Sequence, residues 1–197
     1  MTLALLRRPL PKMSNLIEVR VRELSQLFNT FDPSPFHERD LDDDAETYIV
    51  GSAQELPADA AIRIVVHLPK AEHKQAEERG LAKSLENFFN YRAEMISHQL
   101  KELFRQGSTA LAIGLVVLSL CLFGSQMARS LLGAGPIAGL IEQSLIILGW
   151  VANWRPLEIY LYDWWPIARR RDLYRRLGRA EVRLALDERQ LKQPSKA

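Results

Sequence analysis

The chain has little cysteine and none of the common catalytic motifs. Its 197 residues include one cysteine, Cys121, which excludes an intrachain disulfide and a cysteine metal cluster. It has no P-loop, no G-x-G-x-x-G and no G-x-S-x-G frame. Its four histidines are not spaced as metal ligands. We therefore expect a protein that is not an enzyme and that holds no metal or other cofactor.

The chain also lacks the charge excess of a nucleic-acid-binding protein. The formal net charge is only +2, although residues 38–59 are acidic and residues 155–183 are basic. The segments with strand-like alternation lack the aromatic residues on which an RNA-binding sheet stacks bases. We expect no nucleic-acid partner.

Charge is absent from one long stretch. Residues 106–128 carry no formal charge, and the run is longer than the roughly 18 residues typical of a transmembrane candidate. Gly133, Gly135 and Pro136 then predict a turn, and residues 136–154 are again largely apolar. The sequence therefore predicts a transmembrane hairpin over residues 106–154, with spans at 106–128 and 136–154.

Lysine and arginine predict how this hairpin is oriented. The turn carries only Arg129, whereas the flanks carry Lys101, Arg105, Arg155, Arg169, Arg170 and Arg171. Because basic residues concentrate on the cytoplasmic side of membrane proteins, we expect both termini in the cytoplasm.

Three short segments alternate between apolar and polar residues, as half-buried strands do: residues 16–22, 62–68 and 181–187. A helix over residues 41–56, capped by Asp40, separates the first two and predicts a βαβ-type sheet domain over residues 15–70. The C-terminal strand would complete that domain. The predicted fold class is α+β.

A long amphipathic helix is expected over residues 71–105, unbroken from about residue 76 into the first span. Gly107 and Gly114 are the places where it would bend. Its packing stripe has spacings of three and four: Leu85, Phe89, Ala93, Ile96, Leu100 and Leu103. The stripe needs a partner, so we expect a homo-oligomer.

The segment 155–180 is basic and aromatic. We expect Pro166 to break the chain before a helix at residues 167–177 that lies on the membrane surface against anionic headgroups. An ordinary basic loop is the alternative. The predicted membrane-interface residues are Trp150, Trp154, Tyr160, Tyr162, Trp164 and Trp165, with Arg155, Arg169, Arg170 and Arg171.

Two further groups are candidate sites. Glu142 lies inside the second span, where a carboxylate must face protein or water, so it is either a proton or cation site or the partner of Arg129. If the three strands pair, one sheet face would carry basic side chains that receive a partner or the chain's own acidic helix: Arg20, Arg22, Arg63, His67 and Arg183.

Four segments carry a resemblance to a known group of proteins: FDPSPFHERDLDDDAETYIVGSA, FFNYRAE, LFRQGSTALAIGL and GWVANWRPLEIYLYDWWPI. They are similar to a group of small proteobacterial inner-membrane proteins with a two-helix membrane hairpin, over most of the chain from about residue 15. The resemblance implies a bacterial inner membrane. It implies no activity, cofactor or site residue.

The function expected from these observations is that of a non-enzymatic integral membrane protein, structural or scaffolding or regulatory. It would oligomerise and present a cytoplasmic domain to a protein partner. The alternative is a subunit of an oligomeric channel or transport assembly, with Glu142 or Arg129 lining a path. Residues 1–14 and 188–197 are expected to be tails. The first has its apolar residues before Arg7 and Arg8, the reverse of a signal peptide.

Overall fold

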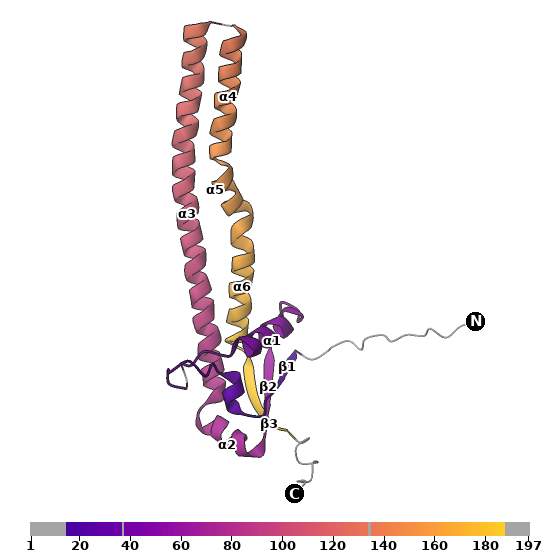
Figure 1. Ribbon diagram of the computed structural model, residues 1–197. Coiled ribbons are helices and arrows are strands. Elements are labelled where there is room, and N and C mark those ends of the chain that lie inside the picture. The colour runs from indigo at the N-terminus through magenta and orange to yellow at the C-terminus, as the bar shows by residue number, and fades with distance from the viewer. Residues whose placement is uncertain (1–14, 37, 134, 188–197) are drawn as a thin grey trace, which may run out of the picture. The chain divides into compact units, whose positions relative to one another are not determined.

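The chain is a mixture of helices and strands that divides into two compact units. The computed structural model describes residues 15–36, 38–133 and 135–187, so both predicted tails and His37 lie outside the described residues. We call Met1–Ala93 with Asp172–Ala197 the sheet unit, and Glu94–Arg171 the helical unit. The elements, drawn in Figure 1, are β1 (Leu16–Arg20), the 3-10 helix η1 (Leu24–Leu27), α1 (Asp43–Gln54), β2 (Arg63–Leu68), α2 (Lys70–Glu78), α3 (Leu81–Leu132), α4 (Pro136–Ala152), α5 (Trp154–Glu158), the π-helical η2 (Ile159–Asp163), α6 (Trp164–Leu177) and β3 (Glu181–Leu186).

The sheet unit is built on three parallel strands in the order β1-β2-β3. Ile17 lies beside Ile64, and Ile64 beside Val182, so apolar positions align across the sheet. Two strands from one end of the chain thus pair with a strand from the other end. The predicted α+β class, the βαβ arrangement and the C-terminal strand are confirmed.

One face of this sheet is buried and the other is open. Ile17, Val19, Ile64, Val66 and Leu68 are buried on the first face. The helices contribute further core residues, among them Ile49 from α1, Ala76 from α2, Leu85 and Phe89 from α3, and Tyr174 and Leu177 from α6. Each large apolar side chain here stabilises the fold by about 1.5–3 kcal/mol. Parallel sheets are usually covered on both faces, so the open face is unusual.

Helix α1 begins later than the sequence suggests. Asp42, not Asp40, is its N-cap, and the Asp42 carboxylate accepts a hydrogen bond from the Asp44 N–H at 3.0 Å. Leu41 is buried and bridges to Phe28, while the Asp40 carbonyl accepts from the Asn29 N–H. Because these contacts hold residues 40 and 41 in extended backbone, the predicted start at residue 41 is wrong.

The predicted helix from residue 71 through the first span is interrupted. Gly80 has a φ of +69°, which glycine adopts without strain, and it separates α2 from α3. From Leu81 the helix continues for 52 residues. It stays α-helical through Gly107 and Gly114, and a bend at either glycine stays a prediction.

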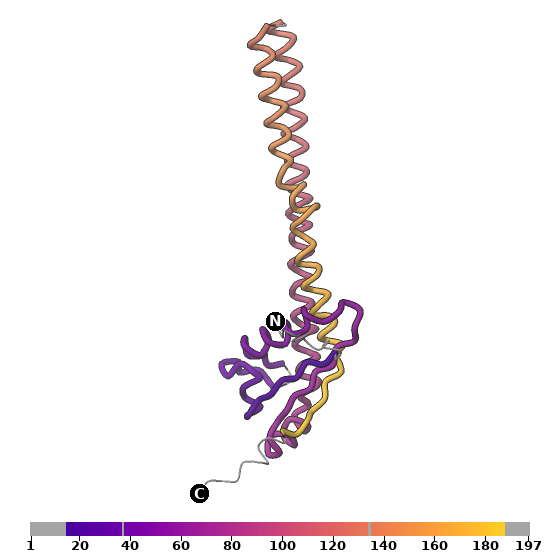
Figure 2. The backbone as a smooth tube through the Cα atoms, turned by 90° about the vertical axis from the view of Figure 1, so that its right-hand side faces the viewer, coloured from indigo at the N-terminus to yellow at the C-terminus, as the bar shows by residue number. Residues whose placement is uncertain are grey.

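In the helical unit α4 runs alongside α3, as both views show (Figures 1 and 2). The turn between them includes Gly133, with a φ of +70°, and Pro136 begins α4. After α4 the chain stays helical through α5, η2 and α6. Pro166 lies in the first turn of α6, directly after the π-helical stretch, where a missing N–H is tolerated. The predicted break at Pro166 is therefore wrong.

Candidate functional site

Two helical stretches are long and apolar enough to cross a membrane: Leu81–Leu132 and Pro136–Leu177. Only 17% of the most apolar window of each is buried, whereas the core helix of a soluble protein would be mostly buried. Many large apolar side chains on the pair are exposed, among them Ile113, Leu120, Phe123, Ile137, Leu140, Ile147 and Val151. The apolar surface of the helical unit thus faces outward.

Close contacts between α3 and α4 depend on glycine and one asparagine. The buried side chain of Asn153 donates from Nδ2 to the carbonyl oxygens of Gly114 at 3.0 Å and Gly149 at 2.9 Å. A Cβ atom on Gly114 would lie 2.6 Å from Asn153 Oδ1, and one on Gly149 would lie 2.7 Å from Leu118 Cδ1. Sequence analysis missed Asn153; the signal available was a polar side chain at the end of an apolar span.

The intramembrane charge predicted at Glu142 has a partner. Arg129 Nη1 lies 3.3 Å from Glu142 Oε1, across the turn between α3 and α4. The Glu142 side chain is 26% exposed and that of Arg129 is 68% exposed. The geometry matches the structural interpretation of Glu142, in which the carboxylate is neutralised by the arginine.

The predicted membrane-interface residues divide into two sets. Trp150, Trp154, Tyr162 and Trp165 are exposed. Tyr160 is 38% exposed and Trp164 is half-buried; their rings lie 5.9 and 6.4 Å from that of Phe104, and the Trp164 indole donates to the Tyr160 carbonyl.

The basic residues of this segment have partners of their own. Arg155 pairs with Glu158 at 3.0 Å and with Asp163 at 3.1 Å. Arg169 lies over the Trp165 ring at 4.2 Å, and Arg170 and Arg171 also have partners. Tyr174 and Leu177, at the far end of α6, are buried in the core of the sheet unit. That end of the predicted surface helix therefore packs against protein rather than lipid.

The packing stripe is buried in both units. Leu85 and Phe89 lie in the core of the sheet unit, and Ile96 and Leu100 are buried in the helical unit, with Leu103 half-buried. The Phe89 ring lies 6.2 Å from that of Tyr174. This chain's own helices thus cover much of the stripe that we expected a second copy to cover.

The open sheet face carries mixed charge. The register places Arg20, Arg63, His67 and Arg183 on it, whereas Arg22 lies beyond the end of β1. Two carboxylates share this face: Glu18 lies 3.8 Å from Arg20, and Glu181 lies 2.6 Å from Arg183. His67 Nε2 is 3.9 Å from Glu18 and accepts or donates no hydrogen bond within the described part of the chain. The uniformly basic face that we expected is therefore half neutralised.

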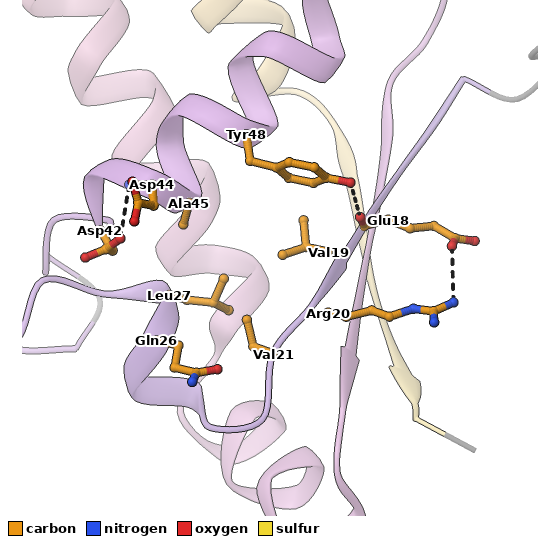
Figure 3. A pocket seen from close by; sticks show the side chains of 10 residues that line it. All are labelled: Glu18, Val19, Arg20, Val21, Gln26, Leu27, Asp42, Asp44, Ala45 and Tyr48. Carbon is orange, nitrogen blue, oxygen red and sulfur yellow. Dashed lines mark hydrogen bonds and ion pairs between the residues drawn. The ribbon is translucent and has the colours of Figure 1, made fainter. Parts of the chain in front are cut away.

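A pocket of about 720 Å³ lies beside β1 in the sheet unit. Its walls come from β1, η1 and the start of α1: Glu18, Val19, Arg20, Val21, Gln26, Leu27, Asp42, Asp44, Ala45 and Tyr48. Figure 3 shows the Tyr48 side chain reaching from α1 to the backbone of Glu18, where its hydroxyl donates to the carbonyl oxygen at 3.0 Å. Sequence analysis did not identify this pocket, because its walls meet only after the strand and helix pack.

Among residues 15–36, 38–133 and 135–187, no three His, Cys, Asp or Glu side chains group as metal ligands. Cys121 is buried between α3 and α4, where its Cβ lies 3.4 Å from the Cβ position of Gly149.

Comparison with known proteins adds no relative: no family model, no curated protein and no solved structure matches this chain.

Proposed function

We propose that this protein is a non-enzymatic integral membrane protein of a bacterial inner membrane, anchored by α3 and α4 as a two-span hairpin. The observation that carries the proposal is the outward-facing apolar surface of the helical unit, where Phe123, Ile137 and Leu140 are each more than two-thirds exposed. Water disfavours such a surface, and lipid removes the cost of about 1.5–3 kcal/mol for each large side chain.

The sheet supports the same topology by an independent argument. β1 precedes the hairpin and β3 follows it, yet both pair with β2. Strands in one sheet must lie on the same side of a membrane, and an even number of crossings returns the chain to that side. The basic flanks, set against a single arginine near the turn, Arg129, support the cytoplasm as that side.

In this proposal the protein is a scaffold or regulator. The hairpin anchors the chain, Arg169, Arg170 and Arg171 attract anionic headgroups, and the sheet unit is offered to a protein partner. We also propose that it self-associates in the membrane, where close packing of small residues drives helix association; Gly139 on α4 has nothing within 4 Å of its Cβ position and leaves room for a second helix. Cross-linking in native membranes that gave only monomer would contradict this last part.

The alternative, a channel or transport subunit, needs polar groups free to line a path. Glu142 is paired with Arg129, and the side-chain amide of Asn153 donates to the carbonyl oxygens of Gly114 and Gly149. These pairings support the anchor over the path.

Cysteine labelling tests the proposed topology. In a Cys121→Ala background, Ser130→Cys lies next to the turn and Ala58→Cys lies in the sheet unit; both positions are exposed. A membrane-impermeant maleimide should label Ser130→Cys in spheroplasts and Ala58→Cys only in inverted vesicles. Both variants should label fully in detergent. Labelling of Ala58→Cys in intact spheroplasts would refute the proposed orientation, and recovery of the chain in the soluble fraction would refute the anchor.

A further inference from the structure

Among residues 15–36, 38–133 and 135–187, no strand pairs with the outer edge of β1, the edge that faces away from β2. The Val21 N–H donates to the His67 carbonyl and the Arg63 N–H to the Asn15 carbonyl. In a parallel ladder the residues between such positions face away from the neighbouring strand. The backbone groups of Glu18 and Arg20 therefore point outward. Within the described residues, the Glu18 carbonyl alone among these groups is hydrogen-bonded, to the Tyr48 hydroxyl.

The pocket beside this edge has an apolar floor and an acidic rim. Val19, Val21, Leu27 and Ala45 line it with apolar side chains. Asp42 and Asp44, in the first turn of α1, supply carboxylates on one side, as Figure 3 shows. Arg20 is the single basic residue of the lining, and in Figure 3 it points away from the floor toward Glu18, with which it pairs at 3.8 Å.

We propose that this edge and pocket bind an extended peptide of a partner protein, which adds to β1 as a fourth strand. Main-chain groups of Glu18 and Arg20 would pair with the peptide, and alternate peptide side chains would enter the pocket. The peptide would carry apolar side chains for the floor and a lysine or arginine for Asp42 and Asp44. Tyr48 covers part of the edge and would release the Glu18 carbonyl when the peptide binds. The inference deepens the proposed function, because it names the class of partner that the sheet unit receives.

The direct test measures binding of a probe peptide to the full chain in neutral detergent micelles. The probe is a capped, dye-labelled octapeptide of alternating valine and lysine, followed by fluorescence anisotropy. Hydrogen exchange then reports whether the amides of Glu18 and Arg20 become protected. The proposal expects protection at these two amides. Binding without protection there would overturn it, and so would an absence of binding.

A proline variant and an alanine variant of Arg20 isolate the contribution of the backbone N–H to peptide binding. Arg20→Pro removes an N–H that faces away from β2, so the β1–β2 ladder keeps its hydrogen bonds. It should weaken binding at least about fivefold, because a hydrogen bond is lost and the proline ring obstructs the edge. Arg20→Ala keeps the N–H and should bind within about twofold of wild type. Equal binding by Arg20→Pro and Arg20→Ala would overturn the proposal; the exchange measurement on wild type decides the matter if Arg20→Pro fails to fold.

Further variants test the pocket itself. Asp44→Asn should weaken binding by about two- to fivefold, whereas the neighbouring Asp43→Asn, which is outside the pocket, should not. Tyr48→Phe should strengthen binding, because the Glu18 carbonyl is freed. A probe with glutamate in place of lysine that bound equally well would overturn the charge assignment. If the peptide does not bind, the topology measured by maleimide labelling still stands. If the labelling contradicts the proposed topology, peptide binding can still be measured, so each proposal can be refuted without the other.

Discussion

Asp32 closes the loop between η1 and α1. Its two carboxylate oxygens accept hydrogen bonds from the Ser34 N–H at 2.9 Å and the Asp40 N–H at 2.8 Å. The bond from Asp40 is the main cause that lowers the pKa of Asp32, followed by those from Ser34. The same loop holds Leu41 in the core and so determines where α1 begins. A single half-buried carboxylate therefore binds backbone N–H groups from two parts of this loop.

The lowered pKa predicts how this loop responds to pH. A carboxyl whose folded pKa is depressed adds stability above its ordinary pKa of about 3.9, and the contribution is lost as pH falls through the folded value. Asp32→Asn should therefore speed amide exchange at Ser34 and Asp40 at pH 7, relative to wild type at the same pH. The difference should shrink below about pH 4. Asp59→Asn, at an exposed position, is the control, and its amide exchange should match that of wild type at every pH. A difference in exchange between Asp32→Asn and wild type that persisted at pH 3 would contradict the role given to Asp32.

At the scale of elements, α3 and α4 are in close contact at two glycines, where an added side chain would collide with the facing residues. Gly149 lies against Leu118, and Gly114 lies against Asn153. If the pair lies in lipid as proposed, there is no hydrophobic force between its helices, and close packing and interhelical hydrogen bonds decide which faces meet. The Asn153 amide adds such a bond at the same point.

This packing predicts opposite effects at two glycines of α4. Gly149→Ala puts a Cβ 2.7 Å from Leu118 Cδ1 and 3.2 Å from its Cα, so the helices must separate. We expect a loss of about 1–3 kcal/mol, typical of overpacking. Gly139 has nothing within 4 Å of its Cβ position, so Gly139→Ala should be neutral or slightly stabilising. Thermal unfolding in detergent, followed by tryptophan fluorescence, measures both. Equal melting temperatures for the two variants would show that the contact between Gly149 and Leu118 does not stabilise the packing of α3 against α4.

At the scale of the whole molecule, the two ends of the chain fold together. β2 is the central strand, so the N-terminal strands cannot complete a sheet without β3. The four tryptophans, Trp150, Trp154, Trp164 and Trp165, all lie in the helical unit, and none lies in the sheet unit. Tryptophan fluorescence therefore reports on the helical unit, and proteolysis within residues 15–93 reports on the sheet unit.

A substitution near the C-terminus should for this reason unfold residues near the N-terminus. Leu184 is half-buried beside the buried Val66, and Leu184→Asp should cost about 1–3 kcal/mol, because it removes apolar contacts and brings a charge against the core. The expected result is rapid proteolysis of the segment 15–93 with unchanged tryptophan fluorescence. Ala185→Asp, on the open face beside His67, should cost less than about 1 kcal/mol. Protease resistance of Leu184→Asp would contradict the central position of β2.

Local sequence determined most of the elements. Alternation identified β1, β2 and β3, because a half-buried strand repeats every two residues. The charge-free run identified the apolar part of α3, because a stretch of about 20 residues that crosses a membrane carries few or no charges. The ion pair of Arg129 with Glu142 was among the predicted alternatives, since an isolated carboxylate in an apolar helix needs a partner.

The tertiary structure decided what depends on contacts between distant residues. The contact of Leu41 with Phe28 keeps Leu41 out of α1, which therefore begins later than predicted. Glu18 and Glu181 neutralise charge on the sheet face that carries Arg20 and Arg183. Tyr174, which was predicted to lie on the membrane surface, is buried in the core of the sheet unit. The β1 pocket and the Asn153 hydrogen bonds join residues that are not adjacent in the sequence. Periodicity reports which side of an element is apolar, but only packing decides which surface meets it.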